Sequence, residues 1–297
     1  MACWDIYQKH RQIWFLEEVF PKLLRWNNWW SENRINGKLL SWGSHLSKNP
    51  YHDEVYHNLA AAMLETGIDD SPMYEGVVFD PEKNMMQMHD VGLNAMYIAD
   101  CYSLAKMAEV LDKKNHASML IQRAKNLQKN MQALWNKENG LYQNFDLIEG
   151  SFSARISPTS FYPLLASTAS EKQAKKMVEQ HLLNEKEFWG KWILPSIAKN
   201  DPRYTEQKYW KGAIWGPMNF LVYQGLRNYP DLAKTRLQFV EKSVAIFEKN
   251  WIEKGFICEN YSPIDGSCTE DRLQSSPWYT WGGLMALIGL MEKGYYD

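Results

Sequence analysis

Residues 91–111 read VGLNAMYIADCYSLAKMAEVL, and the fold prediction starts from the spacing of apolar side chains in this stretch. Three- and four-residue intervals dominate, as in a helix that buries one face. The positions concerned are Leu93, Met96, Ile98, Leu104, Met107 and Leu111. The preceding pair, His89 and Asp90, predicts the start of the helix, because an aspartate side chain can accept hydrogen bonds from the first backbone N–H groups.

The same spacing recurs on both sides of this stretch. Toward the N-terminus, FLEEVFPKLLRWNNWW at 15–30 predicts another helix. Further helical segments are predicted toward the C-terminus, at 116–135, 169–183, 214–229, 232–251 and 280–293. Gly, Pro and Asn separate these segments, and little of the sequence resembles a strand. The sequence therefore predicts an all-α protein.

The joins between the helices are of two kinds. Long, aromatic segments containing Gly and Pro follow residues 64, 135, 182 and 251, whereas the joins at 112–115 and 228–231 are short. Short joins make antiparallel helix pairs, and long loops on one side usually carry binding residues. We therefore expect stacked helical hairpins that form a toroid, with functional loops on one rim. No linker divides the chain, so residues 1–297 are predicted to be one domain.

Composition excludes several classes of partner. The net charge of the 297 residues is −2, so no basic face for nucleic acid or an anionic membrane is expected. The opening residues lack the apolar core of a signal peptide, and no run of about 18 apolar residues follows. We expect a cytoplasmic protein with no membrane partner; its oligomeric state is left open.

The four cysteines are the next class of residue to place. Cys3, Cys101, Cys258 and Cys268 show no CxxC spacing and no disulfide-dense pattern. Cysteines without either pattern are typical of a protein in a reducing compartment. We therefore expect all four to be ordinary thiols.

Acidic residues gather in two of the long loops. ETGIDDSPMYEG at 65–76 contains Asp69 and Asp70, and the loop at 255–283 contains Glu259 together with three further acids. Two carboxylates from distant loops that face one another across a cleft are what glycoside hydrolysis requires. The 14 Trp and 16 Tyr residues offer flat apolar faces with polar edges, which suit a sugar-binding cleft.

Three motifs in order resemble a known family. They are GIDDSP preceded by Glu-Thr, YWKGAIWGPMNF at 209–220, and ENYSPIDG at 259–266, which is followed by WYTWGG. This series is similar to that of the (α/α)6-barrel glycosidases, which include trehalases, processing α-glucosidase I and mannosylglycerate hydrolases (glycoside hydrolase family 63-like). The resemblance covers residues 65–283 and implies an (α/α)6 toroid, or six-hairpin barrel.

The resemblance also implies the catalytic pair. Residues 65–69 are similar to the trehalase-type Glu-Ser-Gly-Trp-Asp segment, which makes Asp69 the expected general acid. Asp70 is expected to orient it, to keep its pKa high or to contact substrate. Glu259, in Glu-Asn-Tyr, is similar to the Glu-x-Tyr segment that carries the general base. If the pair inverts configuration, as the resemblance implies, the carboxyl groups should lie roughly 6.5 to 9.5 Å apart.

Further residues are expected to contact the sugar. Aromatic faces suit the C–H face of a pyranose, and the candidates are Trp42, Tyr209, Trp210, Trp215 and Trp281. The structural alternative for each ring is the aromatic core. Lys211, Asn219 and Tyr261 could supply hydrogen bonds to hydroxyl groups or to Glu259. The histidines His45, His52, His57 and His89 lack a metal-binding spacing, so no metal or cofactor is predicted.

Two departures from the family pattern leave alternatives open. A six-hairpin barrel takes about twelve helices, whereas the sequence accommodates about nine or ten. In addition, the family's Pro-Gly-Gly-Arg-Phe segment has no counterpart. We expect a barrel that lacks its first helices or closes its ring differently.

The predicted function is inverting hydrolysis of an α-linked glucoside or a related small saccharide. The alternative is a truncated or degenerate barrel that binds sugar without catalysis. A third possibility, an α-solenoid scaffold for protein partners, would present a large exposed apolar groove instead of an acidic, Trp-lined pocket.

Overall fold

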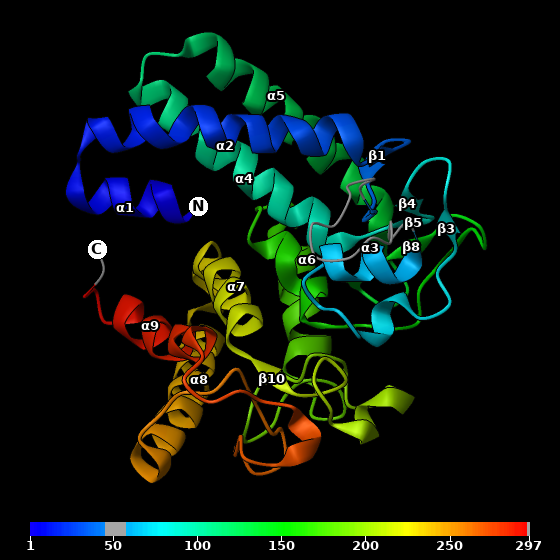
Figure 1. Cartoon of the computed structure of the whole chain (residues 1–297), viewed down its shortest axis with the longest axis vertical. Coiled ribbons are helices and arrows are strands. Elements are labelled where there is room, and N and C mark those ends of the chain that lie inside the picture. The colour runs from blue at the N-terminus through cyan, green and yellow to red at the C-terminus, as the bar shows by residue number, and fades with distance from the viewer. Residues whose placement is uncertain (45–57, 296–297) are drawn as a thin grey trace, which may run out of the picture.

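The computed structural model describes residues 1–44 and 58–295 (Figure 1). Within these ranges the chain forms nine α-helices and a set of two-residue strands. The helices are α1 (Ala2–His10), α2 (Ile13–Asn33), α3 (Leu59–Glu65), α4 (Val91–Val110), α5 (Lys114–Met131), α6 (Glu171–Met177), α7 (Gly216–Arg227), α8 (Ala233–Lys254) and α9 (Gly283–Glu292).

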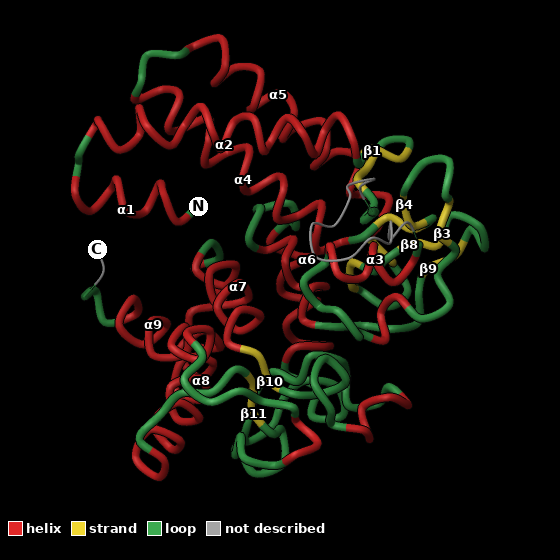
Figure 2. The backbone as a smooth tube through the Cα atoms, in the orientation of Figure 1, coloured by secondary structure: helices red, strands yellow, loops and turns green. Residues whose placement is uncertain are grey.

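The strands pair antiparallel, as β1 with β2, β3 with β4, β6 with β7, β10 with β11, and β8 between β5 and β9. They are β1 (Ile35–Asn36), β2 (Leu39–Leu40), β3 (Phe79–Asp80), β4 (Met85–Met86), β5 (Met88–His89), β6 (Trp135–Asn136), β7 (Leu141–Tyr142), β8 (Phe145–Asp146), β9 (Ser151–Phe152), β10 (Ile214–Trp215) and β11 (Asn260–Tyr261). Figure 2 shows β1 and β3 on the side of the molecule away from both termini.

The helices form a continuous series of packed neighbours. Helix α4 packs on α2, on α5 and on a 3-10 helix at Pro158–Leu164. That 3-10 helix packs on α7, and α7 packs on both α8 and α9. Lys9 at the end of α1 donates a hydrogen bond to the carbonyl of Tyr295 (3.3 Å), so the two ends of the series lie close together.

Helix α4 begins where the sequence predicts. The side chain of Asp90 accepts a hydrogen bond from the backbone N–H of Leu93 (2.7 Å), as expected of a helix cap. The expectation of a single buried face was wrong, however, because buried residues occur all round the helix. Since α2, α5 and the 3-10 helix at Pro158–Leu164 cover it from different sides, α4 is the central helix of the core.

The seven helical segments that the sequence predicts are confirmed, with changes at their ends. The segment predicted at 169–183 begins as α6 and continues as a π-helix at Val178–Leu182. The sequence did not predict α1, nor the 3-10 helix at Pro158–Leu164, which contains Pro163. Proline lacks a backbone donor and clashes with the preceding helical turn, so a segment that contains it is not expected to be helical from its sequence.

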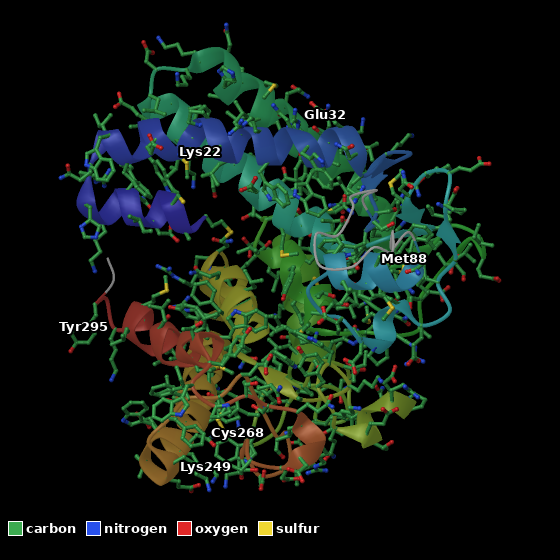
Figure 3. The ribbon with its side chains drawn as sticks, in the orientation of Figure 1. Lys22, Glu32, Met88, Lys249, Cys268 and Tyr295 are labelled. Atoms are coloured by element: carbon green, nitrogen blue, oxygen red, sulfur yellow. A yellow bond between two sulfur atoms is a disulfide. The ribbon has the colours of Figure 1, made fainter. Side chains whose placement is uncertain are left out.

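The prediction that all four cysteines are ordinary thiols was wrong for two of them. Cys258 and Cys268 form a disulfide, whereas Cys3 and Cys101 are free. Both disulfide partners are buried, in the loop that also carries Glu259; Figure 3 labels Cys268. The two cysteines are ten positions apart in the sequence, and this spacing gives no sequence signal of pairing.

In the part of the chain that the structure describes, no helix is both long and apolar enough to span a membrane.

Candidate active site

The loop that carries Asp69 begins where α3 ends. Gly67 has a left-handed backbone (φ +70°), a conformation that glycine adopts without steric cost, and its N–H donates to the carbonyl of Leu64 (3.2 Å). The hydroxyl of Thr66 then accepts a hydrogen bond from the N–H of Ile68 (3.0 Å). The helix therefore ends abruptly, and Asp69 and Asp70 lie on the turn that follows.

A buried ion pair anchors this loop from behind. The Arg34 side chain is 2% exposed and binds both carboxylate oxygens of Glu65, with 2.6 Å between Nε and Oε1. The same Oε1 accepts a hydrogen bond from the N–H of Gly43 (2.9 Å). Gly43 follows Trp42 directly, so the ion pair connects α3 with the segment that carries this tryptophan.

Asp70 joins the first motif to the second. Its Oδ1 accepts a hydrogen bond from the backbone N–H of Trp210 (3.1 Å), and the Lys211 ammonium lies 3.4 Å from its Oδ2. Lys211 also lies 3.6 Å from the carboxylate of Glu206. The carboxylate of Asp70 and the ammonium of Lys211 are therefore engaged with protein groups at the rim of the site.

Glu259 is held by the third motif. Strands β10 and β11 pair so that Trp215 lies opposite Asn260, which fixes the residue directly after Glu259. The backbone N–H of Glu259 donates to the carbonyl of Ser276 (2.9 Å), and the N–H of Ser276 donates to Glu259 Oε2 (3.2 Å). The hydroxyl of Tyr209 lies 3.5 Å from Oε1. The Glu259 side chain is thus buried and bonded at both oxygens.

Asp69, Glu259 and Tyr209 are linked by their effects on one another's pKa. Burial, followed by the charges of Asp70 and Glu259, raises the pKa of Asp69. Burial and the charges of Glu259 and Asp69, in that order, raise the pKa of Tyr209 to about 12. Two carboxyl groups separated by 190 positions in the sequence therefore lie within electrostatic range of each other.

A cavity of about 370 Å³ is lined by the residues that directly precede Asp69. Three of the predicted aromatic residues line it, namely Trp42, Trp210 and Trp281, together with Ile68, which directly precedes Asp69. The indole nitrogen of Trp210 is buried and makes no hydrogen bond within the described residues, whereas the Trp42 side chain interacts with the Asp90 carboxylate. Aromatic faces with an unused N–H donor fit a molecule that has an apolar face and hydroxyl groups.

Asp90 lines the same cavity and was not predicted as a site residue. It is 2% exposed, and its Oδ2 accepts hydrogen bonds from the hydroxyl of Tyr74 (3.1 Å) and the amide of Asn144 (3.0 Å). Burial raises the pKa of Asp90. The sequence offered only its role as a helix cap, because its approach to the cavity depends on long-range packing.

Three predicted substrate contacts lie elsewhere. Trp215 is fully buried and stacks on Trp210, with 3.6 Å between ring centroids, so it supports that ring from behind. The Asn219 amide is engaged with the backbone of Ile193 and Leu194 and with a serine hydroxyl. The Tyr261 hydroxyl is buried and accepts a hydrogen bond from the N–H of Cys258 (3.3 Å). This geometry does not fit direct sugar contacts for these three residues.

Of the four histidines considered as metal ligands, the structure describes His89. His45, His52 and His57 lie outside the described residues. His89 is hydrogen-bonded through Nε2 to the carbonyl of Asn36 (2.7 Å), and burial lowers its pKa. Among residues 1–44 and 58–295, no group of three or more His, Cys, Asp or Glu side chains is arranged to hold a metal ion.

The sequence matches known glycoside hydrolases. A family model described as the mannosylglycerate hydrolase MGH1-like glycoside hydrolase domain matches residues 1–282. Mannosylglycerate hydrolase of Thermus thermophilus is 26% identical over 226 residues, covering 73% of this chain and 49% of that protein. Probable mannosyl-oligosaccharide glucosidase of Schizosaccharomyces pombe is 25% identical over 311 residues, covering 98% of this chain and 36% of that protein. The chain thus spans about half or less of these two relatives.

The fold also matches a solved structure. The crystal structure of GH63 mannosylglycerate hydrolase from Thermus thermophilus in complex with glucose aligns with a TM-score of 0.75 at 22% identity, covering 96% of this chain and 72% of that chain. This likeness confirms the all-α fold of the (α/α)6-barrel class. Together with the family match over residues 1–282, it shows that the chain belongs to the MGH1-like glycoside hydrolase domain family, a GH63-like family of hydrolases.

Proposed function

We propose that this chain is an inverting glycoside hydrolase that cleaves an α-linked glucoside or a related small saccharide. The observation that carries the proposal is the electrostatic influence of Glu259 on Asp69, together with a Trp-lined cavity whose lining includes Ile68, the residue before Asp69. Asp69 has a raised pKa, which suits a group that must stay protonated to act as an acid. Glu259 accepts hydrogen bonds at both oxygens, which suits a carboxylate that acts as a base.

In this mechanism one water molecule is consumed for each glycosidic bond. Glu259 accepts a proton from the water while the water oxygen bonds to the anomeric carbon. The bond from that carbon to the leaving oxygen breaks, and Asp69 gives its proton to the oxygen. Because water attacks the face opposite the leaving group, the product has the inverted anomeric configuration.

The substrate class draws support from the relatives and from the cavity. The two curated relatives are named as a hydrolase of mannosylglycerate and as a glucosidase of mannosyl-oligosaccharides. The cavity volume of about 370 Å³ suits a small saccharide unit between aromatic rings. We therefore propose α-glucosides and α-mannosides as the first substrates to test.

The test is release of free sugar from a panel of α-glucosides and α-mannosides, with the anomer identified by NMR. We expect wild type to release the inverted anomer, and Asp69→Asn and Glu259→Gln each to reduce kcat by about 10²- to 10⁴-fold. Asp265→Asn, in the same loop as Glu259, is the matched control and should keep activity near wild type.

Three outcomes would contradict the proposal. Release of the retained anomer would exclude the inverting mechanism, and full activity of either catalytic variant would exclude its assigned role. No turnover of any panel member by folded wild type would instead favour the sugar-binding barrel without catalysis. Titration of Trp fluorescence with glucose and mannose would then test that alternative.

A further inference from the structure

Tyr209 occupies an unusual backbone conformation at the active site. Its φ is +48°, in the left-handed region that a bulky residue rarely adopts. Its carbonyl accepts a hydrogen bond from the Trp215 indole (3.0 Å), and its ring packs edge-on against the same indole, with 4.9 Å between centroids. Such strain persists only where the surroundings impose the conformation, so the Tyr209 ring is held in one place.

In this conformation the phenol lies beside Glu259. The Tyr209 hydroxyl lies 3.5 Å from Glu259 Oε1, and the charges of Glu259 and Asp69 both act on it. Trp210, the next residue, lines the cavity, whereas Tyr209, like Asp69 and Glu259, is not among the described residues that do so. The hydroxyl of Tyr209 is instead engaged with the carboxylate of Glu259.

We infer that Tyr209 is a positioning residue for the general base, and not the sugar contact that the sequence predicts. Its hydroxyl donates to Glu259 Oε1 while the Ser276 N–H donates to Oε2. Each carboxylate oxygen has two lone pairs, so both oxygens keep a lone pair for the attacking water. The long hydroxyl contact is of the kind that tightens when substrate binds. This inference rests on the proposed roles of Asp69 and Glu259.

The leaving group distinguishes the possible roles of Tyr209. Fluoride departs from a glycosyl fluoride with little help from a general acid, so loss of the acid lowers kcat only slightly with this substrate. Loss of the base lowers kcat as much with the fluoride as with a disaccharide. The experiment compares Tyr209→Phe, Asp69→Asn and Glu259→Gln on α-glucosyl and α-mannosyl fluoride and on the corresponding α-linked disaccharides. The variant Tyr209→Phe removes only the hydroxyl.

We expect Tyr209→Phe to lower kcat by about 10- to 100-fold with both kinds of substrate, the range expected when a hydrogen bond to a charged group is lost, with little change in KM. Tyr295→Phe is the matched control, since the Tyr295 side chain is 71% exposed, lies beyond α9 and also loses only a hydroxyl. Its kcat should stay within about twofold of wild type. Equal melting temperatures would show that all variants are folded.

Several results would overturn the inference. If Tyr209→Phe had wild-type kcat with the glycosyl fluorides but a lowered kcat with the disaccharides, its hydroxyl would assist the general acid and not the base. A rise in KM alone would make Tyr209 a substrate contact. Wild-type kcat for Tyr209→Phe, with Asp69→Asn and Glu259→Gln impaired as proposed, would reject the Tyr209 inference and leave the proposed function intact. If Asp69→Asn and Glu259→Gln also keep full activity, both proposals fail together.

Discussion

Asp69 and Asp70 are adjacent acids with different surroundings. Asp70 is engaged with the Trp210 N–H and the Lys211 ammonium, whereas Asp69 has a pKa raised by burial and by neighbouring charge. The family resemblance selects Asp69 as the acid, and the structure offers a physical reason for the pairing. Asp70 joins two loops and at the same time adds the negative charge that favours the protonated form of Asp69.

The first prediction concerns this charge. In Asp70→Asn the negative charge beside Asp69 is lost, so the pKa of Asp69 should fall. A general acid acts only while protonated, so activity is lost as pH rises through its pKa. The alkaline limb of the pH profile of kcat/KM should therefore move to lower pH, which initial rates across a pH series would measure.

The matched control is Asp80→Asn, which changes a half-buried aspartate at the end of β3, outside the site, and should leave this limb in place. An unchanged alkaline limb in a folded Asp70→Asn would show that Asp70 does not set the protonation of Asp69.

At the scale of elements, the Arg34–Glu65 ion pair connects α2, α3 and the segment after β2. Arg34 is the C-terminal cap of α2, and Glu65 is the last residue of α3. Glu65 also accepts a hydrogen bond from the N–H of Gly43. A Cβ atom on Gly43 would lie 2.2 Å from the carbonyl oxygen of Asn84, so this approach requires glycine. The pair therefore positions both Trp42 and the loop that carries Asp69.

The second prediction follows from the burial of this pair. Glu65→Gln would leave the Arg34 charge buried without a counter-ion, and the free energy of unfolding should fall by about 3 kcal/mol. Activity should fall with it, because the Asp69 loop loses its anchor. Urea denaturation of wild type and variant would measure the change.

Glu18→Gln is the control, because it makes the same substitution in the solvent-exposed Glu18–Lys22 pair on α2. No measurable change in stability is expected there. A Glu65→Gln variant as stable as Glu18→Gln would refute the anchoring role of the buried pair.

At the scale of the whole molecule, two segments far apart in sequence meet beside the cavity. Gly216 begins α7, and a Cβ atom at this position would lie 2.1 Å from the carbonyl oxygen of Trp281. Trp281 lines the cavity, just before α9 begins. The segments at 209–220 and 278–283 can therefore pack this closely only because residue 216 is a glycine.

The third prediction tests this contact. Gly216→Ala should lower the free energy of unfolding by about 2 kcal/mol, because backbone atoms must move to admit the methyl group. It should also reduce activity through the displacement of Trp281. Thermal unfolding and turnover of the variant would measure both effects.

Gly283→Ala is the matched control, since Gly283 begins α9 and its Cβ would meet only a side-chain atom of Ile257 at 3.6 Å. This variant should remain as stable as wild type. Equal stability of the two variants would contradict the proposed close packing at Gly216.

The sequence by itself determined the helical class, the cap of α4 at Asp90 and, through three motifs, the family. These features depend on local spacing and on the identity of short segments, which are written directly in the chain. It also identified Trp42, Trp210 and Trp281 as aromatic candidates for the cavity. Its assignment of Asp69 and Glu259 as the catalytic pair remains a prediction.

Only the tertiary structure decided which polar groups face the cavity and which support the fold. Asn219 and Tyr261 form hydrogen bonds with the backbone, Cys258 pairs with Cys268, and Asp90 reaches the cavity. The physical reason is common to all of them. A side chain's partners are set by elements that lie far away in sequence, and local periodicity contains no information about those contacts.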